Sequence, residues 1–136
     1  MLTLGEEMSR IGRHYGNRTA VVDESSSLSW KDFSTRIATA AGMLRGLGIE
    51  PGQRIAIYSR NSARFDELKW GAFHAGIVAV PINWRLAPPE IAHILQDSKC
   101  EPIFIEEDFV DIFDSPELQP WRDKLIKLTG PREDAL

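Results

Sequence analysis

Arg85 is a residue whose type and position could support ligand binding. It lies in the segment Pro81–Leu86 (PINWRL), directly after a run of β-branched residues that predicts a strand. Open α/β sheets bind ligands beyond the carboxyl ends of their strands. An arginine there could hold a phosphate through two parallel N–H groups. Judged by type and position alone, an ordinary surface arginine is the favoured interpretation of Arg85.

A second candidate is the acidic run Glu106–Asp108, which follows another predicted strand. These carboxylates could form a functional site at the end of that strand. The same residues also stand where a helix is predicted to begin, and acidic side chains in that position offset the helix dipole. The capping role is therefore favoured over a chemical one.

Metal and nucleophile chemistry finds little support in the sequence. His14, His74 and His93 show no H-x-x-x-H pairing, and Cys100 has no cysteine or histidine nearby. The histidines are expected to be ordinary surface or core residues, and His74 is expected to interact with the C-terminus of its helix. No G-x-S-x-G nucleophile elbow is present. We therefore predict no catalytic residue and no metal ligand in this chain.

The glycine spacing does not predict a phosphate-binding loop. The G-x-G-x-x-G pattern after a strand does not occur. Gly71 and Gly76 have the spacing of the two glycines in G-x-x-x-x-G-K-[ST], but Ile77 and Val78 stand where Lys and Ser or Thr are required. These glycines are instead predicted to lie within a helix and at its end.

Length and composition indicate a single globular domain. The chain has 136 residues, and 20 acidic against 16 basic residues give a formal net charge of −4. Because nucleic-acid binding depends on clustered Lys and Arg, no nucleic-acid partner is expected. The single cysteine excludes an internal disulfide and fits a reducing compartment.

No targeting segment is predicted either. The N-terminus lacks the apolar run of a signal peptide. The longest apolar stretch, 75–82, is far shorter than the roughly 20 residues of a membrane-spanning helix. We therefore expect a cytoplasmic protein with no membrane span.

Alternating helices and strands are predicted to position these residues. A helix is expected over 4–15 and a β-hairpin over 19–30. Ser29 is the expected N-cap of the next helix. The continuous apolar run 77–82 is typical of a strand covered on both faces. The other predicted elements are strands over 54–59, 102–105 and 125–128 and helices over 63–75, 88–98, 109–113 and 117–123.

The helix that follows Ser29 is amphipathic. Its apolar face is formed by residues spaced three and four apart: Phe33, Ile37, Ala41, Leu44 and Leu47. The whole order of elements predicts an α/β fold, in which a short β-hairpin precedes a mostly parallel sheet with flanking helices in βαβ units.

Four segments together resemble the N-terminal end of the adenylate-forming (AMP-binding) superfamily, which includes acyl-CoA and aryl-CoA synthetases. They are 28–33 (LSWKDF), 47–57 (LGIEPGQRIAI), 70–83 (WGAFHAGIVAVPIN) and 84–95, which contains WRL and PEIAHIL. Order and spacing agree with the family pattern over about residues 4–107. The resemblance implies part of the N-terminal subdomain of the acyl-CoA synthetase fold. The expected division is an α/β subdomain over 1–129, with a hairpin (19–30), a βαβ core (31–106) and short helices with a strand (107–129), followed by a tail (130–136).

This resemblance implies an ATP-dependent acyl-CoA ligase of fatty acid or aryl acid metabolism, which adenylates a carboxylate and transfers the acyl group to CoA. ATP, Mg and CoA are therefore implied for the intact enzyme. In family members the phosphate loop, the Mg-linked acidic residue, the ribose-binding Asp and the catalytic Lys lie in later segments, and none has a counterpart here. The chain is thus expected to be a truncated N-terminal fragment that is inactive alone and binds no cofactor alone.

The resemblance also carries a role for one residue. Arg85 matches an arginine that lies close to the CoA nucleotide phosphate in some aryl-CoA ligases. Tyr58, Ser59 and Asn61 match a stretch that borders the substrate side of the first sheet, without a fixed catalytic role.

Two positions depart from the family pattern. Gln53 replaces the usual Asp, and Ala87 replaces the Ser or Thr that commonly caps the next helix. Pro88 compensates in part at the second position by fixing φ. Neither departure changes the assignment.

Other functions stay open at this point. The chain could be a stand-alone α/β ligand-binding module without catalysis, or an assembly unit. Its expected partner is the missing downstream part of the synthetase, or a self-association partner bound through exposed apolar surface. The candidates for that surface are Trp70, Phe73, Phe104 and Phe109.

Overall fold

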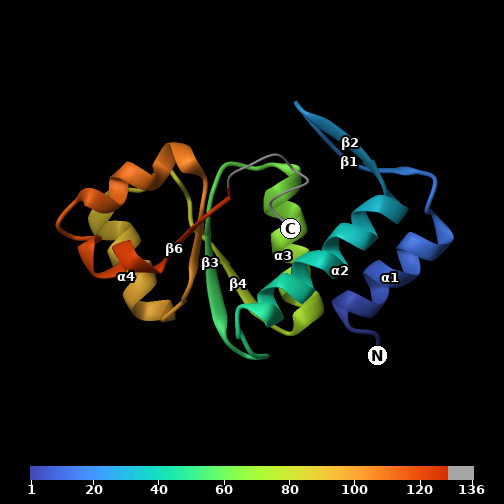
Figure 1. Ribbon diagram of the computed structural model, residues 1–136, viewed down its shortest axis with the longest axis horizontal. Helices are drawn as coiled ribbons and strands as arrows, with labels where there is room; N and C mark the ends of the chain where they lie inside the picture. The colour runs from blue at the N-terminus through green and yellow to red at the C-terminus, as the bar shows by residue number, and fades with distance from the viewer. Residues whose placement is uncertain (129–136) are drawn as a thin grey trace. The chain divides into compact units, whose positions relative to one another are not determined.

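The structure, a computed structural model, describes residues 1–128, so the predicted tail 130–136 lies outside the described residues. The chain forms two compact units (Figure 1). Among the described residues, the helical unit contains 1–52 and 61–77, and the sheet unit contains 53–60 and 78–128. The chain therefore passes from one unit to the other three times.

The helical unit consists of three helices and a hairpin. Its elements are α1 (Leu4–His14), β1 (Thr19–Asp23), β2 (Ser26–Ser29), α2 (Trp30–Gly46) and α3 (Ala63–Ala75). The three helices pack against one another, with α2 contacting both α1 and α3 (Figure 1). A buried cluster of Met8, Phe33 and Ile37 joins α1 to α2, and Trp70 of α3 packs against it.

Helix α2 follows the predicted pattern except at its end. Ser29 is its N-cap, and the Ser29 hydroxyl accepts a hydrogen bond from the Asp32 backbone N–H at 3.1 Å. Four of the five predicted face residues are buried, as expected for a helix that packs along one stripe. The expectation for the fifth is wrong: Leu47 is the C-cap and is 51% exposed, because the helix has already ended there.

Glycine allows α2 and α3 to approach closely. A Cβ atom added at Gly71 would lie 2.6 Å from the Ala40 Cβ and 3.1 Å from the Ala41 backbone nitrogen. Gly76, at the end of α3, has a φ of 74°, a left-handed conformation that favours glycine. These positions confirm the prediction that Gly71 lies within a helix and Gly76 at its end, and the close approach of α2 adds a packing role for Gly71.

The sheet unit contains a parallel four-stranded sheet in the order β4-β3-β5-β6. Its strands are β3 (Arg54–Tyr58), β4 (Val78–Pro81), β5 (Ile103–Ile105) and β6 (Leu125–Lys127). Helix α4 (Pro88–Ser98) connects β4 to β5, and two 3-10 helices, η1 (Glu107–Asp114) and η2 (Gln119–Lys124), connect β5 to β6. The predicted α/β class, with a mostly parallel sheet preceded by a hairpin, is confirmed.

One buried cluster covers a face of this sheet. Side chains alternate between the two faces of a strand, so Ala56 and Tyr58 of β3 share a face with Ile103 and Ile105 of β5. These residues pack with α4 and η1 through a buried apolar set that includes Ile91, Leu95, Val110 and Phe113. The cluster fixes the start of η1 beside the end of β3.

The predicted burial of two segments is corrected by the structure. The run 77–82 is not a strand covered on both faces: β4 is an edge strand, and Val78 is 46% exposed. The strands buried throughout are instead the inner pair, β3 beyond Arg54 and β5. Phe104, expected on an exposed apolar surface, is 1% exposed because it lies in the middle of β5, and Trp70, Phe73 and Phe109 are half-buried.

The described helices include none with the length and apolar character needed to cross a membrane.

Candidate functional site

The carboxyl ends of the four parallel strands meet at one edge of the sheet. From β3 the chain adds β4 on one side and then crosses back to add β5 on the other side, so the direction of winding reverses between β3 and β5. Open α/β sheets hold ligands at such a reversal. The residues that follow these two strands, Ser59 and Arg60 after β3 and Glu106 after β5, therefore mark a candidate site.

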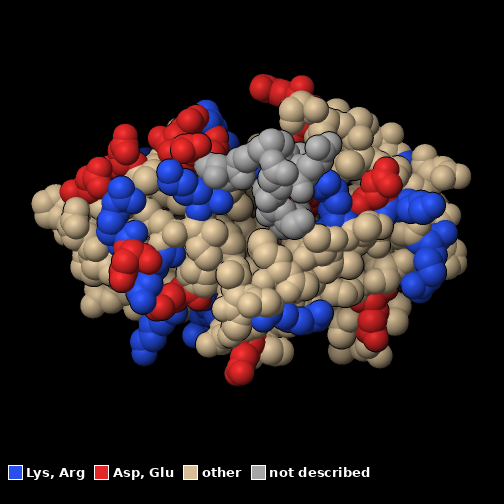
Figure 2. Space-filling model, viewed as in Figure 1, with Lys and Arg blue, Asp and Glu red and all other residues tan. Residues whose placement is uncertain are grey.

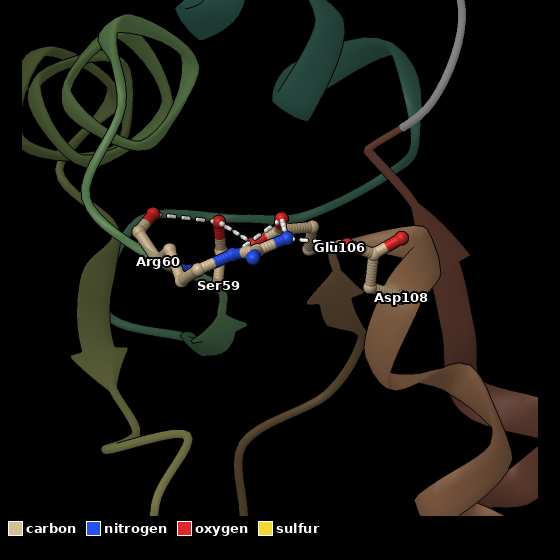
Figure 3. A network of polar contacts seen from close by, with 4 residues as sticks. All are labelled: Ser59, Arg60, Glu106 and Asp108. Atoms are coloured by element: carbon tan, nitrogen blue, oxygen red, sulfur yellow. Dashed lines mark hydrogen bonds and ion pairs between the residues drawn. The ribbon is translucent and has the colours of Figure 1, made fainter.

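Arg60 and Glu106 join the ends of β3 and β5 (Figure 3). The Glu106 carboxylate accepts hydrogen bonds from the Arg60 backbone N–H at 2.9 Å and from the Arg60 Nε at 2.8 Å. The Arg60 Nη2 forms ion pairs with both Glu106 and Asp108. The Ser59 hydroxyl lies 3.3 Å from Glu106 Oε2 and donates to the Arg60 carbonyl oxygen at 2.8 Å. One guanidinium is thus held by two carboxylates.

The charges in this network stabilise one another. Partial burial raises the pKa of Glu106, but hydrogen bonds from Arg60 oppose burial, and the net pKa lies below the ordinary value. The hydrogen bonds to Glu106 and Asp108 raise the pKa of Arg60. Both groups are therefore ionised at neutral pH. Because the charge of Arg60 is already matched, this network is structural and leaves no spare cation for a ligand.

The acidic run stands at the start of a helix, as the sequence predicts, but Glu106 does not cap that helix with its side chain. Glu106 is the N-cap residue of η1, yet its side chain caps no backbone N–H of that helix. Its carboxylate is used by Arg60 instead, and Glu107 and Asp108 lie in the first turn of η1. Sequence reasoning missed Arg60, although both arginines follow the end of a predicted strand: Arg60 comes directly after 54–59, and Arg85 comes three residues after 77–82. That shared position is the signal that could have found it.

Aromatic side chains connect this network to Arg85. The Phe109 ring lies 5.3 Å from the Arg60 guanidinium carbon and stacks on the Trp84 ring, with centroids 5.5 Å apart and planes at 17°. The Arg85 guanidinium in turn lies over the Trp84 ring, with its carbon 4.4 Å from the ring centroid. The backbone N–H of Arg85 donates to Asn83 Oδ1 at 3.0 Å. A stacked row thus runs from the end of β3 to the turn after β4.

Tyr58 holds this row in place through a hydrogen bond and two ring contacts. Its hydroxyl donates to the Trp84 carbonyl oxygen at 3.1 Å. Its ring forms T-shaped contacts with the rings of Phe109 and Phe113, with interplanar angles of 83° and 89°. Burial raises the pKa of the Tyr58 hydroxyl, which therefore stays protonated and able to donate. Tyr58 is a positioning residue for the turn that carries Arg85.

Arg85 differs from Arg60 because, within residues 1–128, its guanidinium is not already paired with carboxylates. The side chain is exposed, and among the described residues no carboxylate pairs with it. An arginine held against an indole face keeps its N–H groups at the guanidinium edge for an anion. Of the two arginines, Arg85 is the one available to a phosphate.

The remaining candidates are explained by packing. Cys100 is buried, its Sγ lies 2.9 Å from the Ser98 hydroxyl, and burial raises the pKa of its thiol. His74 faces Gly5 of α1 closely, while the carbonyl oxygen of His74 accepts from the Arg45 guanidinium at 3.5 Å. Within residues 1–128 no cluster of three histidine, cysteine or carboxylate side chains could hold a metal ion.

Comparison with known proteins identifies related sequences. A sequence model of AMP-binding enzymes matches residues 8–133. A fatty acid–[acyl-carrier-protein] ligase of Streptomyces coeruleorubidus is 35% identical over 107 residues, which are 79% of this chain and 21% of that protein. A 4-hydroxybenzoate–CoA/benzoate–CoA ligase of Rhodopseudomonas palustris is 33% identical over 99 residues, 73% of this chain and 18% of that protein. The chain thus spans about a fifth of these relatives.

Solved structures are also similar to this chain in fold. The N-terminal domain of FACL13 from Mycobacterium tuberculosis superimposes with a TM-score of 0.85 at 28% identity, over 93% of this chain and 33% of that domain's chain. A long-chain-fatty-acid CoA ligase of Rhodopseudomonas palustris, described as putative, gives a TM-score of 0.84 at 27% identity, over 96% of this chain and 34% of that chain.

Proposed function

Because this chain belongs to the family of AMP-binding enzymes, we propose that it supplies the N-terminal part of an ATP-dependent acid–CoA ligase. Such a ligase joins a fatty or aryl carboxylate to AMP with release of pyrophosphate, and then transfers the acyl group to the CoA thiol with release of AMP. The names of the relatives support this class, since they act on fatty and aromatic acids. The division expected from the sequence, an α/β subdomain over 1–129, is part of the same proposal.

Within that enzyme, we assign Arg85 to a phosphate of CoA. The observation that carries this assignment is the pairing of Arg85 with Trp84, whose ring lies 4.4 Å from the guanidinium carbon beyond the end of β4. An exposed guanidinium without a carboxylate partner among residues 1–128 fits a phosphate, which accepts two parallel N–H groups. The contact would position CoA and would not take part in bond making.

ATP and Mg fit this part of the enzyme less well. Magnesium prefers carboxylate oxygens and phosphate together, and the carboxylates at the strand ends, Glu106 and Asp108, already pair with Arg60. No residue described here is therefore assigned to ATP or Mg. Both belong to later segments of the intact ligase, and the isolated chain is proposed to be inactive.

A chimera tests the role of Arg85. Residues 8–128 would replace the aligned segment of the Rhodopseudomonas palustris benzoate–CoA ligase, and benzoyl-CoA formation would be measured at varied CoA. Arg85→Ala should raise the KM for CoA by about ten-fold, and Arg85→Lys by less. Benzoate-dependent pyrophosphate release in a single turnover without CoA should stay unchanged. Arg122→Ala, which removes a cation that already pairs with Asp114, is the matched control. An unchanged KM for CoA would overturn the assignment.

The isolated chain tests the rest of the proposal. With ATP, Mg²⁺ and benzoate or a fatty acid it should release no pyrophosphate, and a turnover of about 1 s⁻¹ or more would contradict the proposal. Calorimetry with ATP, AMP and CoA distinguishes a ligase fragment from the alternative, a stand-alone binding module. Micromolar binding of any of the three by this chain alone would favour that module.

A further inference from the structure

A basic pocket lies in the helical unit, and none of its lining residues belongs to the candidate site described above. Its lining residues come from the end of α1, the loop that follows and the start of α2, and its volume is about 560 Å³. Four of them carry basic side chains: Arg13, His14, Arg18 and Lys31. No acidic residue lines it. Figure 2 shows Lys and Arg gathered over the end of α1 and the following loop, at the right edge of the view.

This concentration of charge contrasts with the chain as a whole. The formal net charge of the chain is −4, yet the stretch from Arg10 to Arg18 contains three arginines and no acidic residue. Arg10 is neutralised by Glu7, one turn before it on α1. Arg10 does not line the pocket.

The pocket cations lack such partners. Elsewhere in the chain, six cationic side chains on α2, α3, η2, β6 and the end of β3 form ion pairs with carboxylates: Arg36, Arg60, Lys69, Arg122, Lys124 and Lys127. Within the described part of the chain, Arg13, Arg18 and Lys31 have no ion-pair partner. Instead the Arg18 guanidinium lies over the Tyr15 ring, 5.2 Å from its centroid. Three positive charges therefore converge without compensation.

Backbone hydrogen bonds hold this arrangement together. The Lys31 N–H donates to the Gly16 carbonyl oxygen at 3.1 Å, and the Trp30 N–H donates to the Arg18 carbonyl oxygen at 2.9 Å. A Cβ atom added at Gly16 would lie 2.9 Å from the Gly12 carbonyl oxygen and 3.5 Å from the Lys31 Cβ. The loop is thus fixed against the first turn of α2, and the bases of the Arg18 and Lys31 side chains are held at the same rim.

We propose that this pocket binds a phosphate-bearing ligand with at least two negative charges. Arginine recognises phosphate through two parallel N–H groups and lysine recognises it as a point charge. Three uncompensated cations suit a diphosphate or a phosphomonoester better than a single carboxylate. A nucleic acid is a poorer match, since it is bound through many phosphate contacts spread along a surface and not through one small pocket. The inference does not depend on the proposed ligase activity.

The ligand could come from two sources, a soluble diphosphate or the phosphomonoester headgroup of a lipid. Calorimetry of the whole chain with pyrophosphate tests the first source. Co-sedimentation with phosphatidylcholine vesicles that contain about one fifth phosphatidic acid tests the second. Binding in one experiment alone identifies the source, and binding in both supports the shared chemistry. Failure to bind either probe at low salt overturns the proposal.

Variants connect the binding to the pocket. Arg18→Ala and Lys31→Ala should each weaken binding by about five-fold, whereas Lys31→Arg should preserve it. Arg10→Ala is the matched control, because it removes one positive charge from α1, whose end lines the pocket, without changing the pocket lining. If Arg10→Ala weakens binding as much as Arg18→Ala, net charge explains the effect and the pocket does not. All three substituted residues are exposed, and thermal unfolding of each of the four variants verifies that it folds.

Discussion

The Asp23 carboxylate accepts a hydrogen bond from the backbone N–H of Ala63 at 2.9 Å. Asp23 ends strand β1, and Ala63, 40 residues later, begins helix α3. The same carboxylate accepts from the hydroxyls of Ser25 and Ser26 in the hairpin turn. A single side chain therefore closes the turn and caps a distant helix, alongside the local cap Ser62.

Loss of this carboxylate should destabilise the chain. Asp23→Ala removes the acceptor of the Ala63 N–H and should lower the free energy of unfolding at pH 7 by about 1–2 kcal/mol. Glu24→Ala, in the same turn, is the control and should change it little. Urea unfolding followed by circular dichroism measures both. Equal stability of Asp23→Ala and wild type would show that the bond contributes nothing.

The same hydrogen bond predicts a pH dependence. The Ala63 N–H, and after it the Ser26 hydroxyl, hold the pKa of Asp23 well below its ordinary value. A carboxyl with a lowered folded-state pKa contributes stability above its unfolded pKa, about 3.9. That contribution is lost as the pH falls toward the folded pKa. The gap between wild type and Asp23→Asn should therefore shrink between about pH 4 and pH 2.

Glu106→Gln should weaken the connection between β3 and β5. The variant keeps the shape of the side chain but removes the charge that pairs with Arg60. Because Arg60 is half exposed, solvent screens the pair, and the free energy of unfolding should fall by only about 0.5–1 kcal/mol. Glu107→Gln is the control, since its pair with Lys127 is more exposed. A larger loss in the control than in Glu106→Gln would contradict the role of the network.

Two glycine-to-alanine substitutions should act in opposite directions. Gly71→Ala places a methyl group 2.6 Å from the Ala40 Cβ, so α2 and α3 must separate, at a cost of about 1–3 kcal/mol. Gly42→Ala, within α2, meets nothing within 4 Å and should stabilise the chain by up to about 1 kcal/mol. Chemical denaturation of both variants tests the pair. If both destabilise alike, helix packing at Gly71 is not the cause.

Self-association of the isolated chain remains a prediction, and the structure moves it to another surface. Val78 is 46% exposed on β4, an edge strand of the sheet. An exposed apolar residue on an unpaired strand edge favours pairing with a second chain, and a lysine there opposes it. We expect wild type to form dimers or larger species in light scattering at micromolar concentrations, and Val78→Lys to shift toward monomer. A monomeric wild type across that range would exclude the prediction.

Local sequence signals predicted the elements well. Helices α3 and α4 begin and end where the sequence predicted, at Ala63–Ala75 and Pro88–Ser98. At Ala87 the missing side-chain cap is compensated further along the helix, because the Glu90 carboxylate accepts the Ala87 N–H at 2.8 Å. Caps, glycines and apolar spacing act within a few residues, so a single sequence contains them.

Contacts between distant residues were beyond that kind of reasoning. Arg60 and Glu106 are 46 residues apart, and only the pairing of β3 with β5 brings them together. Strand order also decided burial: the β-branched run at 78–81 resembles an inner strand by composition but occupies the edge. The role of Arg85 depends on Trp84 and Phe109, whose stacking requires both the turn after β4 and the start of η1. Composition contains no information about such neighbours.

The threefold passage of the chain between the two units limits how it can be divided. Strand β3 of the sheet unit is followed by α3 of the helical unit, and β4 then returns to the sheet unit. A single protease cut at 52, 60 or 77 therefore leaves at least one unit with its segments on both fragments. Neither unit can be excised by one cleavage or expressed as one continuous segment. Limited proteolysis should consequently give fragments that stay associated until a denaturant separates them.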